Sequence, residues 1–347
     1  MIVALDAQLA VGTATGIGTY VRDVESALMR AGVHVQPLRA PRLDPWRFDR
    51  RALWDQVLLP WQAARSGATV LHAASGTLPL VRTLPTVLTV HDMAWHRAQD
   101  YARAYARMYF GTLQCRAYRN ADAIVCDSAF TAAELREITG IAKQIEVIHP
   151  GVDARFAALE RAPDAQPFAL VVGTVEPRKN LLVLVEALAR VPGLRIVSIG
   201  PHTTYAASVQ RRAAELGVGD RLDLRGYVTR EQADELYRTA ALALIPSRYE
   251  GFGYALAEAM CAGVPVIASR SSSLIEVAAD TVPLCNPDEV DAWSSAIADV
   301  LAVRDAAERA AAARRAESVR RFDWDDVAQR MIPIYQSLVR EPSLGTA

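Results

Sequence analysis

Two glutamates eight residues apart enclose a glycine-rich segment in the C-terminal half of this chain. Glu250 precedes Gly251-Phe252-Gly253, and Glu258 lies in the run Tyr254–Ala262, which holds no other charge. The two glycines let the backbone turn sharply and approach a ligand closely. A helix that is apolar all round is a buried helix, and a buried carboxylate needs a hydrogen-bond donor or a proton. Two kinds of partner therefore remain open for Glu258: an arginine or backbone amide of the protein, or a pair of ligand hydroxyl groups.

The sequence on either side predicts the elements that position these glutamates. The apolar run Ala241–Ile245 predicts a strand, Tyr254–Ala262 predicts a helix that Gly263 ends, and Val264–Ala268 predicts a second strand. Strand, glycine loop, helix and strand make one parallel crossover unit. Its loop lies at the ligand-binding edge of the sheet.

A second chemically suggestive group lies between another predicted strand and helix. The strand Phe168–Val172 leads into Gly173–Asn180, and the apolar helix Leu181–Ala189 follows. Arg178 and Lys179 thus place two cations at the start of a helix, where unpaired backbone amides also favour an anion. We expect the pair to bind one anion, the alternative being a solvated loop of charges.

Length and composition exclude several classes of protein. A chain of 347 residues predicts two domains, and the formal net charge of −1 argues against a nucleic-acid-binding protein. No apolar run approaches the roughly 18 residues that span a bilayer. The N-terminal residues resemble a first strand and not a signal peptide, so we expect a cytoplasmic protein, with peripheral attachment to the inner face of the membrane as an alternative. The cysteines have no metal-ligand spacing and are expected to be reduced and buried: Cys115, Cys126, Cys261 and Cys285.

Short apolar runs also alternate with helix-length segments in the N-terminal half, which predicts a doubly wound parallel sheet. The predicted strands are Ile2–Leu5, Val33–Leu38, Val70–Ala73, Thr86–Val90 and Ala123–Cys126. Polar residues end three of them: His72, His91-Asp92 and Asp127-Ser128. We expect the carboxyl ends of these three strands to lie at the ligand crevice of the sheet. For His91 a buried, hydrogen-bonded histidine is the alternative, and a metal site with Asp92 and His96 is disfavoured because no further ligands have suitable spacing.

The segment Gly16–Gly18, which precedes a predicted helix at Tyr20–Met29, is not a dinucleotide-binding fingerprint. Val21 occupies the place of the third glycine, and the interval from the preceding strand is too long. A nicotinamide-dependent dehydrogenase is therefore rejected. A flexible glycine loop at a helix start still suits an anion, although a plain turn explains it equally well.

The stretch Arg97–Arg119 combines five arginines with aromatic residues and a single acid. Tyr101, Tyr105 and Tyr109 recur at helical spacing, which predicts an amphipathic helix that packs its tyrosines. A basic and aromatic face is also what a peripheral membrane enzyme presents to anionic lipid or to a lipid-linked diphosphate.

Taken together, E-G-F-G-x4-E-A-M-x2-G-x-P-V from Glu250 and G-T-x2-P-R-K-N from Gly173 resemble the motifs of retaining glycosyltransferases of family 4. The resemblance implies the α/β GT-B fold: two Rossmann-like, doubly wound domains that face a central cleft, with a C-terminal helix returning to the first domain. The implied domains are residues 1–162, which bind the acceptor, residues 163–322, which bind the nucleotide sugar, and the helix in residues 323–347. Asp323-Trp324-Asp325-Asp326 contains a D-x-D pattern, which we interpret as the cap of that last helix and not as a metal motif.

The resemblance also assigns roles to residues. Glu258 would hold the ribose hydroxyls, Glu250 would lie by the transferred sugar, and Arg178 and Lys179 would neutralise the donor diphosphate. The catalytic set is then His91, Arg178, Lys179 and Glu250; the donor-binding set is Gly18, Gly173, Tyr227, Val228, Phe252, Gly253, Tyr254, Ala255 and Glu258; the acceptor-side set is Gly16 and Ser128. The chain departs from many relatives at Tyr254-Ala255, where they have Leu-Pro.

The implied reaction is a metal-independent hexosyl transfer without a cofactor, from a nucleotide-diphosphate sugar to a hydroxyl of a glycan or lipid-linked glycan. The motif style favours a mannosyltransferase that uses GDP-mannose in cell-surface polysaccharide assembly, of which lipopolysaccharide O-antigen is an example. A nucleotide-sugar epimerase, a glycan phosphorylase and a non-catalytic nucleotide-sugar-binding module share the architecture and remain alternatives.

Overall fold

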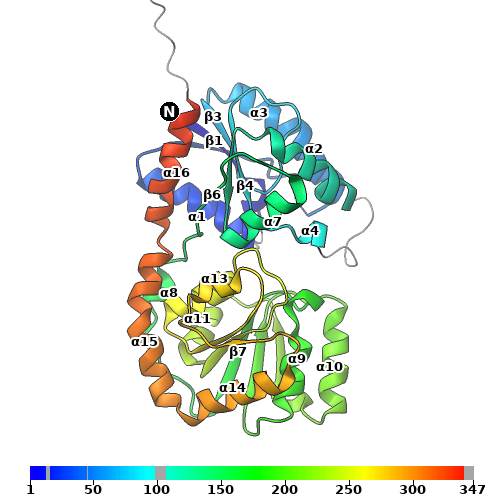
Figure 1. The fold of residues 1–347 in the computed structure, drawn as a ribbon, viewed down its shortest axis with the longest axis vertical. Helices are drawn as coiled ribbons and strands as arrows, with labels where there is room; N and C mark the ends of the chain where they lie inside the picture. Colours follow the sequence, from blue (N-terminus) through cyan, green and yellow to red (C-terminus); the bar gives the residue numbers. More distant parts are fainter. Residues whose placement is uncertain (13–15, 45, 98–106, 340–347) are drawn as a thin grey trace, which may run out of the picture. The chain divides into compact units, whose positions relative to one another are not determined.

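The computed structural model describes residues 1–12, 16–44, 46–97 and 107–339. The chain divides into two units, Met1–Gly151 together with the segment from Asp323 onward, and Val152–Phe322 (Figure 1). This division lies closer to the N-terminus than the predicted boundary after residue 162. The physical reason is that Val152 and Phe156 belong to the hydrophobic core of the second unit, and Ala162 N donates a hydrogen bond to Arg238 O there.

The sheet of the first unit has six parallel strands in the order β2-β1-β3-β4-β5-β6. Their bounds are β1 Ile2–Asp6, β2 His34–Leu38, β3 Val70–Ala73, β4 Thr86–Val90, β5 Ala123–Cys126 and β6 Glu146–Val147. From β1 the chain goes first to β2 on one side and then to β3 on the other, so the topological switch point lies between β1 and β3. In a sheet of this kind, ligands bind outside the carboxyl ends of the strands at that point.

The helices of the first unit are η1 Gln8–Ala10, α1 Gly16–Arg30, α2 Phe48–Leu53, η2 Trp54–Leu58, α3 Leu59–Arg65, α4 Ala94–Arg97, η4 Arg107–Gln114, α6 Cys115–Ala117, η5 Tyr118–Asn120, α7 Ala129–Thr139 and α16 Trp324–Leu338. The prediction that Gly16–Gly18 forms a loop is wrong, because α1 already begins at Gly16. Gly18 is buried inside the helix, where the apolar face formed by Tyr20 and Val24 packs on the core. Tertiary packing here outweighs the modest helix penalty of glycine.

The C-terminal helix α16 belongs to the first unit, in agreement with the prediction. Asp323 caps it through Oδ1, which accepts a hydrogen bond of 2.8 Å from Asp325 N. The interpretation of the aspartates as a cap is therefore confirmed. Near the start of α16, the ring centres of Trp324 and of Tyr20 on α1 lie 5.6 Å apart. Near its end, the Tyr335 hydroxyl lies 2.9 Å from Nδ1 of His72 on β3. The helix is therefore held by α1 and by the sheet.

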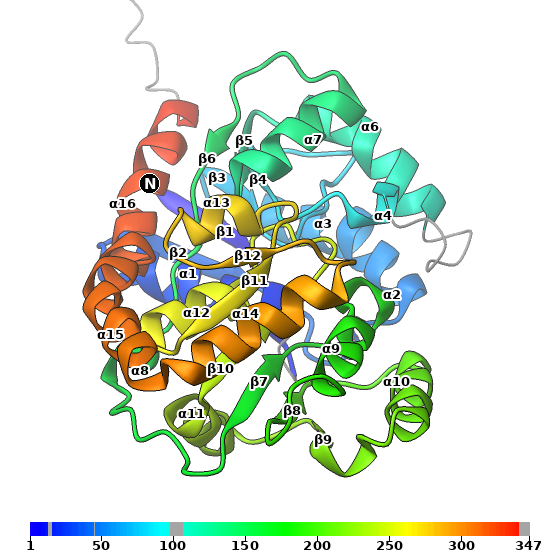
Figure 2. The same ribbon diagram turned by 60° about the horizontal axis from the view of Figure 1, so that its bottom comes forward.

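The second unit contains six parallel strands in the order β12-β11-β10-β7-β8-β9 (Figure 2). The strands are β7 Phe168–Val172, β8 Arg195–Ile199, β9 Leu222–Gly226, β10 Leu242–Ile245, β11 Val266–Ser269 and β12 Leu284–Cys285. The helices are α8 Arg155–Ala158, η6 Pro177–Lys179, α9 Leu181–Leu188, α10 Tyr205–Glu215, η7 Gly219–Arg221, α11 Arg230–Thr239, α12 Tyr254–Ala262, α13 Leu274–Ala278, α14 Val290–Ala302 and α15 Arg304–Arg321. The switch point of this sheet lies between β7 and β10.

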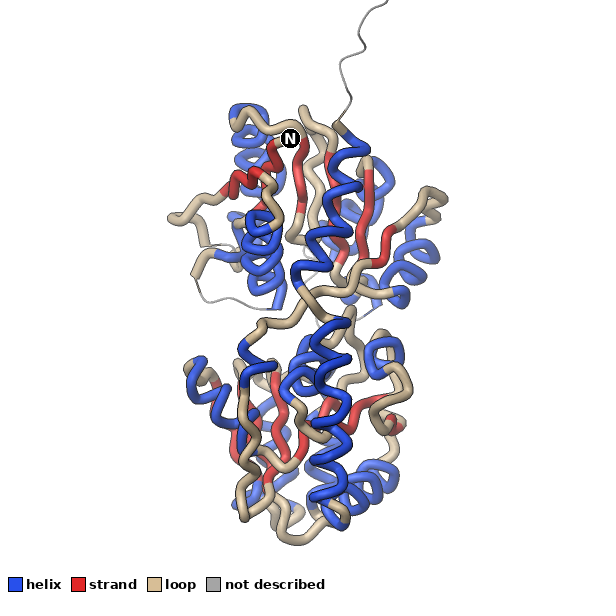
Figure 3. The backbone as a smooth tube through the Cα atoms, turned by 90° about the vertical axis from the view of Figure 1, so that its left-hand side faces the viewer, coloured by secondary structure: helices blue, strands red, loops and turns tan. Residues whose placement is uncertain are grey.

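Helices cover both faces of the second sheet, in the layered arrangement drawn in Figure 3. Alternate residues of β7 enter two separate cores: Leu170 packs with Leu256 of α12 on one face, and Ala169 packs with Leu184 of α9 on the other. This alternation follows from the two-residue repeat of a strand. Each unit is therefore a Rossmann-like layer structure. None of the helices in the described part of the chain combines the length and apolar composition that crossing a bilayer requires.

Candidate active site

The predicted donor residues gather at the switch point of the second sheet. The loop Gly173–Asn180 follows β7, and the loop Pro246–Gly253 follows the neighbouring strand β10. Parallel strands bring their carboxyl ends to one edge, so these two loops lie next to each other. Arg248 N donates a hydrogen bond of 2.9 Å to Arg178 O, which joins them directly.

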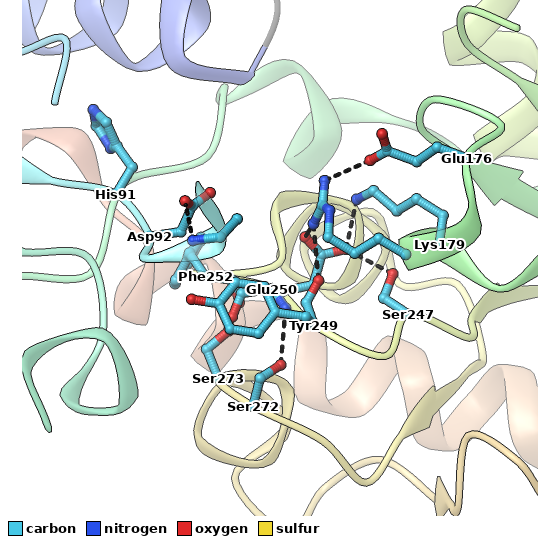
Figure 4. Close-up of polar contacts among 12 residues, drawn as sticks. His91, Asp92, Glu176, Lys179, Ser247, Tyr249, Glu250, Phe252, Ser272 and Ser273 are labelled. Atoms are coloured by element: carbon cyan, nitrogen blue, oxygen red, sulfur yellow. Dashed lines mark hydrogen bonds and ion pairs between the residues drawn. The ribbon is translucent and has the colours of Figure 1, made fainter. Parts of the chain in front are cut away.

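Glu250 is the centre of this cluster (Figure 4). Its Oε1 accepts hydrogen bonds from Lys179 Nζ at 2.5 Å and from Ser247 Oγ at 2.6 Å. Its Oε2 accepts from Arg178 Nη1 at 3.0 Å. The two predicted cations and the first predicted glutamate therefore meet in one charge-assisted network, while their roles toward a substrate stay predictions.

The ionisation of Glu250 follows from this environment. Burial of the carboxyl raises its pKa, but the charges of Lys179 and Arg178 outweigh burial and lower the pKa to about 2. Glu250 is thus an anion at neutral pH, and it balances positive charge at the switch point. Glu176 adds a second carboxylate, since its Oε1 accepts a hydrogen bond of 2.8 Å from Arg178 Nη2.

A glycine is required where Lys179 passes the end of β7. Gly173 has a φ of 137°, and a Cβ at this position would lie 3.3 Å from Lys179 Cε. Another residue would be strained in the backbone and would crowd the lysine. Gly173 is therefore explained by the position of Lys179, and its contact with a donor stays a prediction.

Serines that the sequence analysis did not select hold the Glu250 loop. Ser272 Oγ accepts a hydrogen bond of 2.9 Å from Glu250 N, and Ser273 Oγ lies 2.8 Å from Glu250 O and 2.9 Å from Phe252 O. Ser272 adopts the left-handed backbone region, with a φ of 47°. The only signal in the sequence was a run of three serines after a predicted strand, and that pattern alone is also typical of an ordinary turn.

The second glutamate lies on α12. Glu258 Oε2 accepts a hydrogen bond of 2.8 Å from the hydroxyl of Tyr237, which is buried on α11. Burial, and then the charge of Glu258, raise the pKa of that phenol well above its ordinary value. One partner of Glu258 is therefore a tyrosine, a residue that the sequence analysis did not consider.

The first turn of α12 connects Glu258 with the cations. Ala255 lines the same small pocket as Lys179, Glu250 and Gly173. Residues three apart lie on one face of a helix, so Glu258 shares a face with Ala255. The helix begins at Gly253, whose φ of 100° no other residue adopts easily, and a Cβ there would lie 2.6 Å from Leu274 Cδ2.

In the first unit, His91 lies directly after β4 with both ring nitrogens engaged. Nδ1 lies 2.7 Å from Asp127 Oδ2, and Nε2 lies 2.8 Å from Ala74 O. Burial lowers the pKa of the imidazole, but the carboxylate of Asp127 outweighs burial and raises it. Two acceptors favour the doubly protonated ring. The structure therefore gives His91 the internal bonds of the buried, hydrogen-bonded histidine considered from the sequence.

Comparison with known proteins supplies the family. The family model described as "Glycosyl transferases group 1" matches residues 155–317, and the one described as "Glycosyltransferase Family 4" matches residues 14–156. The chain is 32% identical over 306 residues to the D-inositol 3-phosphate glycosyltransferase of Xylanimonas cellulosilytica, which covers 82% of this chain and 72% of that protein. This chain belongs to the family 4 glycosyltransferases. It is an enzyme of the glycosyl-transferring class.

One further relative in sequence and one solved structure are similar to this glycosyltransferase. It is 34% identical over 178 residues to the O-antigen chain mannosyltransferase B of Escherichia coli, which covers 50% of this chain and 46% of that protein. Sucrose-phosphate synthase from Thermosynechococcus elongatus has the same fold, with a TM-score of 0.79, 24% identity and coverage of 97% and 99% of the two chains. The predicted GT-B fold is thereby confirmed.

Other predicted site residues of this glycosyltransferase lie in different surroundings. Tyr227 is 63% exposed, whereas Val228 packs against the core that contains Leu256. In the first unit Ser128 caps α7, because its Oγ accepts a hydrogen bond of 3.0 Å from Thr131 N. Gly16 lies at the start of α1. Contact of any of these residues with a substrate stays a prediction.

The switch point of the first sheet is lined by buried polar residues that the sequence analysis missed. Asp6 ends β1 and accepts a hydrogen bond of 2.8 Å from Trp54 Nε1, and Arg51 Nε lies 2.9 Å from Asp55 Oδ1. Thr77, in the loop after β3, accepts a hydrogen bond of 2.6 Å from Arg51 Nη2. Asp55 and Arg51 lie on the η2 and α2 helices, at a spacing that sequence inspection interprets as an ordinary surface pair.

In the stretch Arg97–Arg119 the described tyrosines are buried, whereas Arg116 and Arg119 are exposed. Arg97 pairs with Glu134 at 2.8 Å, and Tyr109 donates a hydrogen bond of 3.0 Å to Asp55. The buried Tyr118 donates one of 2.6 Å to Gly76 O. This agrees with the first interpretation, a segment that packs its tyrosines. Tyr101 and Tyr105 lie outside the described residues.

Within the described ranges, no three or more His, Cys, Asp or Glu side chains come together in a way that could hold a metal ion. The cluster around Glu250 is instead a mixed set of two cations and two carboxylates, whose charges balance. Such a set can bind and stabilise an anion whose charge increases during a reaction.

Proposed function

We propose that this glycosyltransferase moves a hexose, with retention of configuration, from a nucleoside-diphosphate sugar to a hydroxyl of a glycan or lipid-linked glycan. The observation that carries the proposal is the convergence of Lys179, Arg178 and Glu250 at the switch point of the second sheet. GDP-mannose is the first donor to test, because one relative is named a mannosyltransferase of an O-antigen chain. The name of another relative makes a phosphorylated polyol a second acceptor class to include.

The proposed donor contacts follow from the charges. The diphosphate of the donor replaces Glu250 as a partner of Lys179 and Arg178. Glu258, which the Tyr237 hydroxyl orients, accepts hydrogen bonds from the two ribose hydroxyls. The loop amides around Phe252 and Gly253 lie at the start of α12, where backbone N–H groups favour anionic or hydroxyl oxygens.

In the proposed reaction, the bond between the anomeric carbon and the diphosphate oxygen breaks, and a bond to the acceptor oxygen forms on the same face. The acceptor proton passes to the departing diphosphate. The negative charge on that group increases as the bond breaks, so its attraction to Lys179 and Arg178 strengthens in the transition state. Since these cations supply the electrostatic role of a divalent ion, we propose that the reaction needs no metal and no cofactor. Loss of activity after EDTA treatment and dialysis would refute that part.

The lysine content of the chain offers a direct test. Lys179 is one of only two lysines, and the other, Lys143, lies in the first unit with Nζ 2.5 Å from Ala121 O. Acylation of the native protein, quantified by mass spectrometry, should be suppressed at Lys179 by GDP-mannose or GDP and should be unchanged at Lys143. A panel that includes UDP, UDP-glucose and inorganic phosphate would identify the base and distinguish a diphosphate site from a general anion site. If no nucleotide in the panel reduced the labelling of Lys179, the donor assignment would be refuted.

Product analysis separates the proposed transfer from related chemistry. Donor and acceptor together should give a new glycoside with the anomeric configuration of the donor, measured by NMR. An altered sugar from the donor alone would instead indicate an epimerase. Cleavage of a glycan by inorganic phosphate would indicate a phosphorylase.

A further inference from the structure

One helical stretch of the first unit carries apolar side chains on its exposed side as well as on its buried side. Residues 48–65 form a continuous helical path through α2, η2 and α3 (Figure 1). The side that faces the protein packs Trp54 and Leu59 on the core and also contains an ion pair, Arg51 with Asp55, whose side chains are 6% and 0% exposed. The opposite side presents Leu53, Val57 and Trp61, which are 44%, 53% and 57% exposed.

Helical geometry makes these three exposed residues a single row. They recur every four positions, and side chains four apart lie on one side of an α-helix and stay close to that side through the wider π-helical turn of η2. The outer face of an ordinary surface helix is charged and its inner face is apolar. Single exposed apolar residues are common, but a row on the outer face of a helix that buries an ion pair is not explained by the core.

The neighbouring loop widens this row into a surface. Gln56 of η2 makes two hydrogen bonds with the loop that follows β3. Its Nε2 donates to Leu78 O at 3.3 Å, and its Oε1 accepts from Leu80 N at 3.0 Å. Leu80 and Val81 are 52% and 74% exposed. We name the surface formed by Leu53, Val57, Trp61, Leu80 and Val81 the apolar ridge.

The charges beside the apolar ridge are predominantly positive. Residues 46–65 contain two acids: Asp49 is bound by Arg47, and Asp55 is bound inside the unit by Arg51. Arg50 and Arg65 add two further positive charges, and the Arg65 guanidinium lies 5.4 Å from the centre of the Trp61 ring. Tryptophan beside arginine is typical of the zone where acyl chains meet headgroups.

We propose that the apolar ridge inserts into the surface of an anionic lipid bilayer, with the flanking arginines at the headgroups. Charge favours this occupant over a second copy of the chain, since two ridges packed together would bring the excess positive charge of both copies into one interface. Acidic headgroups complement it. The inference depends on neither the donor nor the reaction. It also moves the expected lipid contact away from Arg97–Arg119, whose described tyrosines are internal.

The test is flotation of the full chain with vesicles of phosphatidylcholine alone and of phosphatidylcholine mixed with phosphatidylglycerol. The wild type should bind the anionic vesicles, and added salt should weaken that binding. Val57→Glu and Trp61→Glu should each lower the partition coefficient by about tenfold or more, the size expected when one large apolar side chain leaves lipid. Blue-shifted tryptophan fluorescence on binding, lost in Trp61→Gln, provides a second readout.

Controls make the result specific. Val303→Glu changes an equally exposed valine, 57% exposed, in the second unit and should leave binding unchanged. Arg116→Glu, an exposed arginine of α6, should also leave it unchanged. The inference is overturned if Val57→Glu binds like the wild type, if only Arg116→Glu reduces binding, or if sedimentation shows that Val57→Glu turns a dimer into a monomer without changing lipid binding. Lysine labelling with nucleotide, which needs no lipid, reports separately on the donor site.

Discussion

Glu250→Gln tests the central electrostatic feature of the site. The substitution keeps the size and the hydrogen-bonding shape of the side chain but removes its charge. Lys179 and Arg178, which are 22% and 25% exposed, then face a neutral amide. Because both cations lie partly out of water, we expect the variant to be less stable than the wild type at neutral pH.

The magnitude follows from the pKa of Glu250. A shift from 4.5 to about 2, at about 1.4 kcal/mol per pKa unit, corresponds to about 3 kcal/mol of stability at pH 7. Since the pKa in the folded state is lowered, this contribution is fully present above the unfolded value of 4.5 and is lost as the pH falls toward 2. The difference between wild type and variant should therefore be large at pH 7, smaller at pH 3.5 and nearly absent at pH 2.

Urea denaturation of both proteins at these three pH values measures the difference. Comparison at equal pH cancels the contribution of every other titrating group. Glu308→Gln is a suitable control, because that carboxylate also binds an arginine, Arg161, but lies away from the cluster. A stability difference below about 1 kcal/mol at pH 7, or one that persists undiminished at pH 2, would refute the view that the two cations hold Glu250 ionised.

Three further predictions address the donor site and the first unit. Lys179→Ala should lower turnover by about 100- to 1000-fold, the cost of removing a comparable oxyanion donor, whereas Lys143→Ala should leave turnover unchanged in the same assay. Glu258→Ala should weaken nucleotide binding in isothermal titration, and Tyr237→Phe should weaken it less while leaving turnover at saturation close to normal; unchanged affinity in Glu258→Ala would refute the ribose assignment. Burial, with a smaller contribution from the charge of His91, lowers the pKa of His72 from 6.5 to about 3, so stability should fall as the pH drops below 6.5, by about 2 kcal/mol at pH 5. His72→Asn should flatten that dependence in urea titrations at pH 7 and pH 5, and an equally steep dependence in the variant would contradict the assignment.

The sequence predicted the sheets well because strands buried on both faces leave strong signals. Val70–Ala73, Thr86–Val90, Ala123–Cys126 and Phe168–Val172 are strands with the predicted bounds. Continuous apolar runs of this length, separated by helix-length segments, are typical of strands in a parallel sheet that is covered on both faces. The helix Tyr254–Ala262 was also predicted correctly, since Gly253 and Gly263 mark its two ends.

Features that depend on tertiary contact were not predictable in the same way. The serines around Glu250 act through single hydrogen bonds from a loop more than twenty residues away, and no local pattern distinguishes them from turn residues. The partner of Glu258 is another example, because Tyr237 in isolation is a typical apolar residue on a helix. The start of α1 was placed too late, since glycine is a weak indicator wherever packing decides.

The exposure of the apolar ridge was not predictable from the sequence either. Residues 48–65 carry apolar side chains on more than one side of the helical stretch: Trp54 and Leu59 are buried, whereas Val57 and Trp61 are exposed. The buried Arg51 forms an ion pair with Asp55 and donates a hydrogen bond to Thr77, so the pair can be buried while Val57 and Trp61 remain exposed. The apolar pattern alone does not tell which of these side chains face the core.

The charge balance at the second switch point bears on how the site can act as a catalyst. With Glu250 and Glu176 opposite Lys179 and Arg178, the charges of the resting cluster balance, so we expect it not to bind every anion tightly. A cluster of unpaired cations would bind the donor and the nucleoside diphosphate product strongly, and strong binding of the ground state does not accelerate the reaction. A balanced cluster whose carboxylates can be exchanged for phosphate oxygens responds most to the additional charge that develops on the leaving group. We therefore propose that Glu250 contributes to catalysis without a chemical step of its own, because it sets the charge against which the transition state is stabilised.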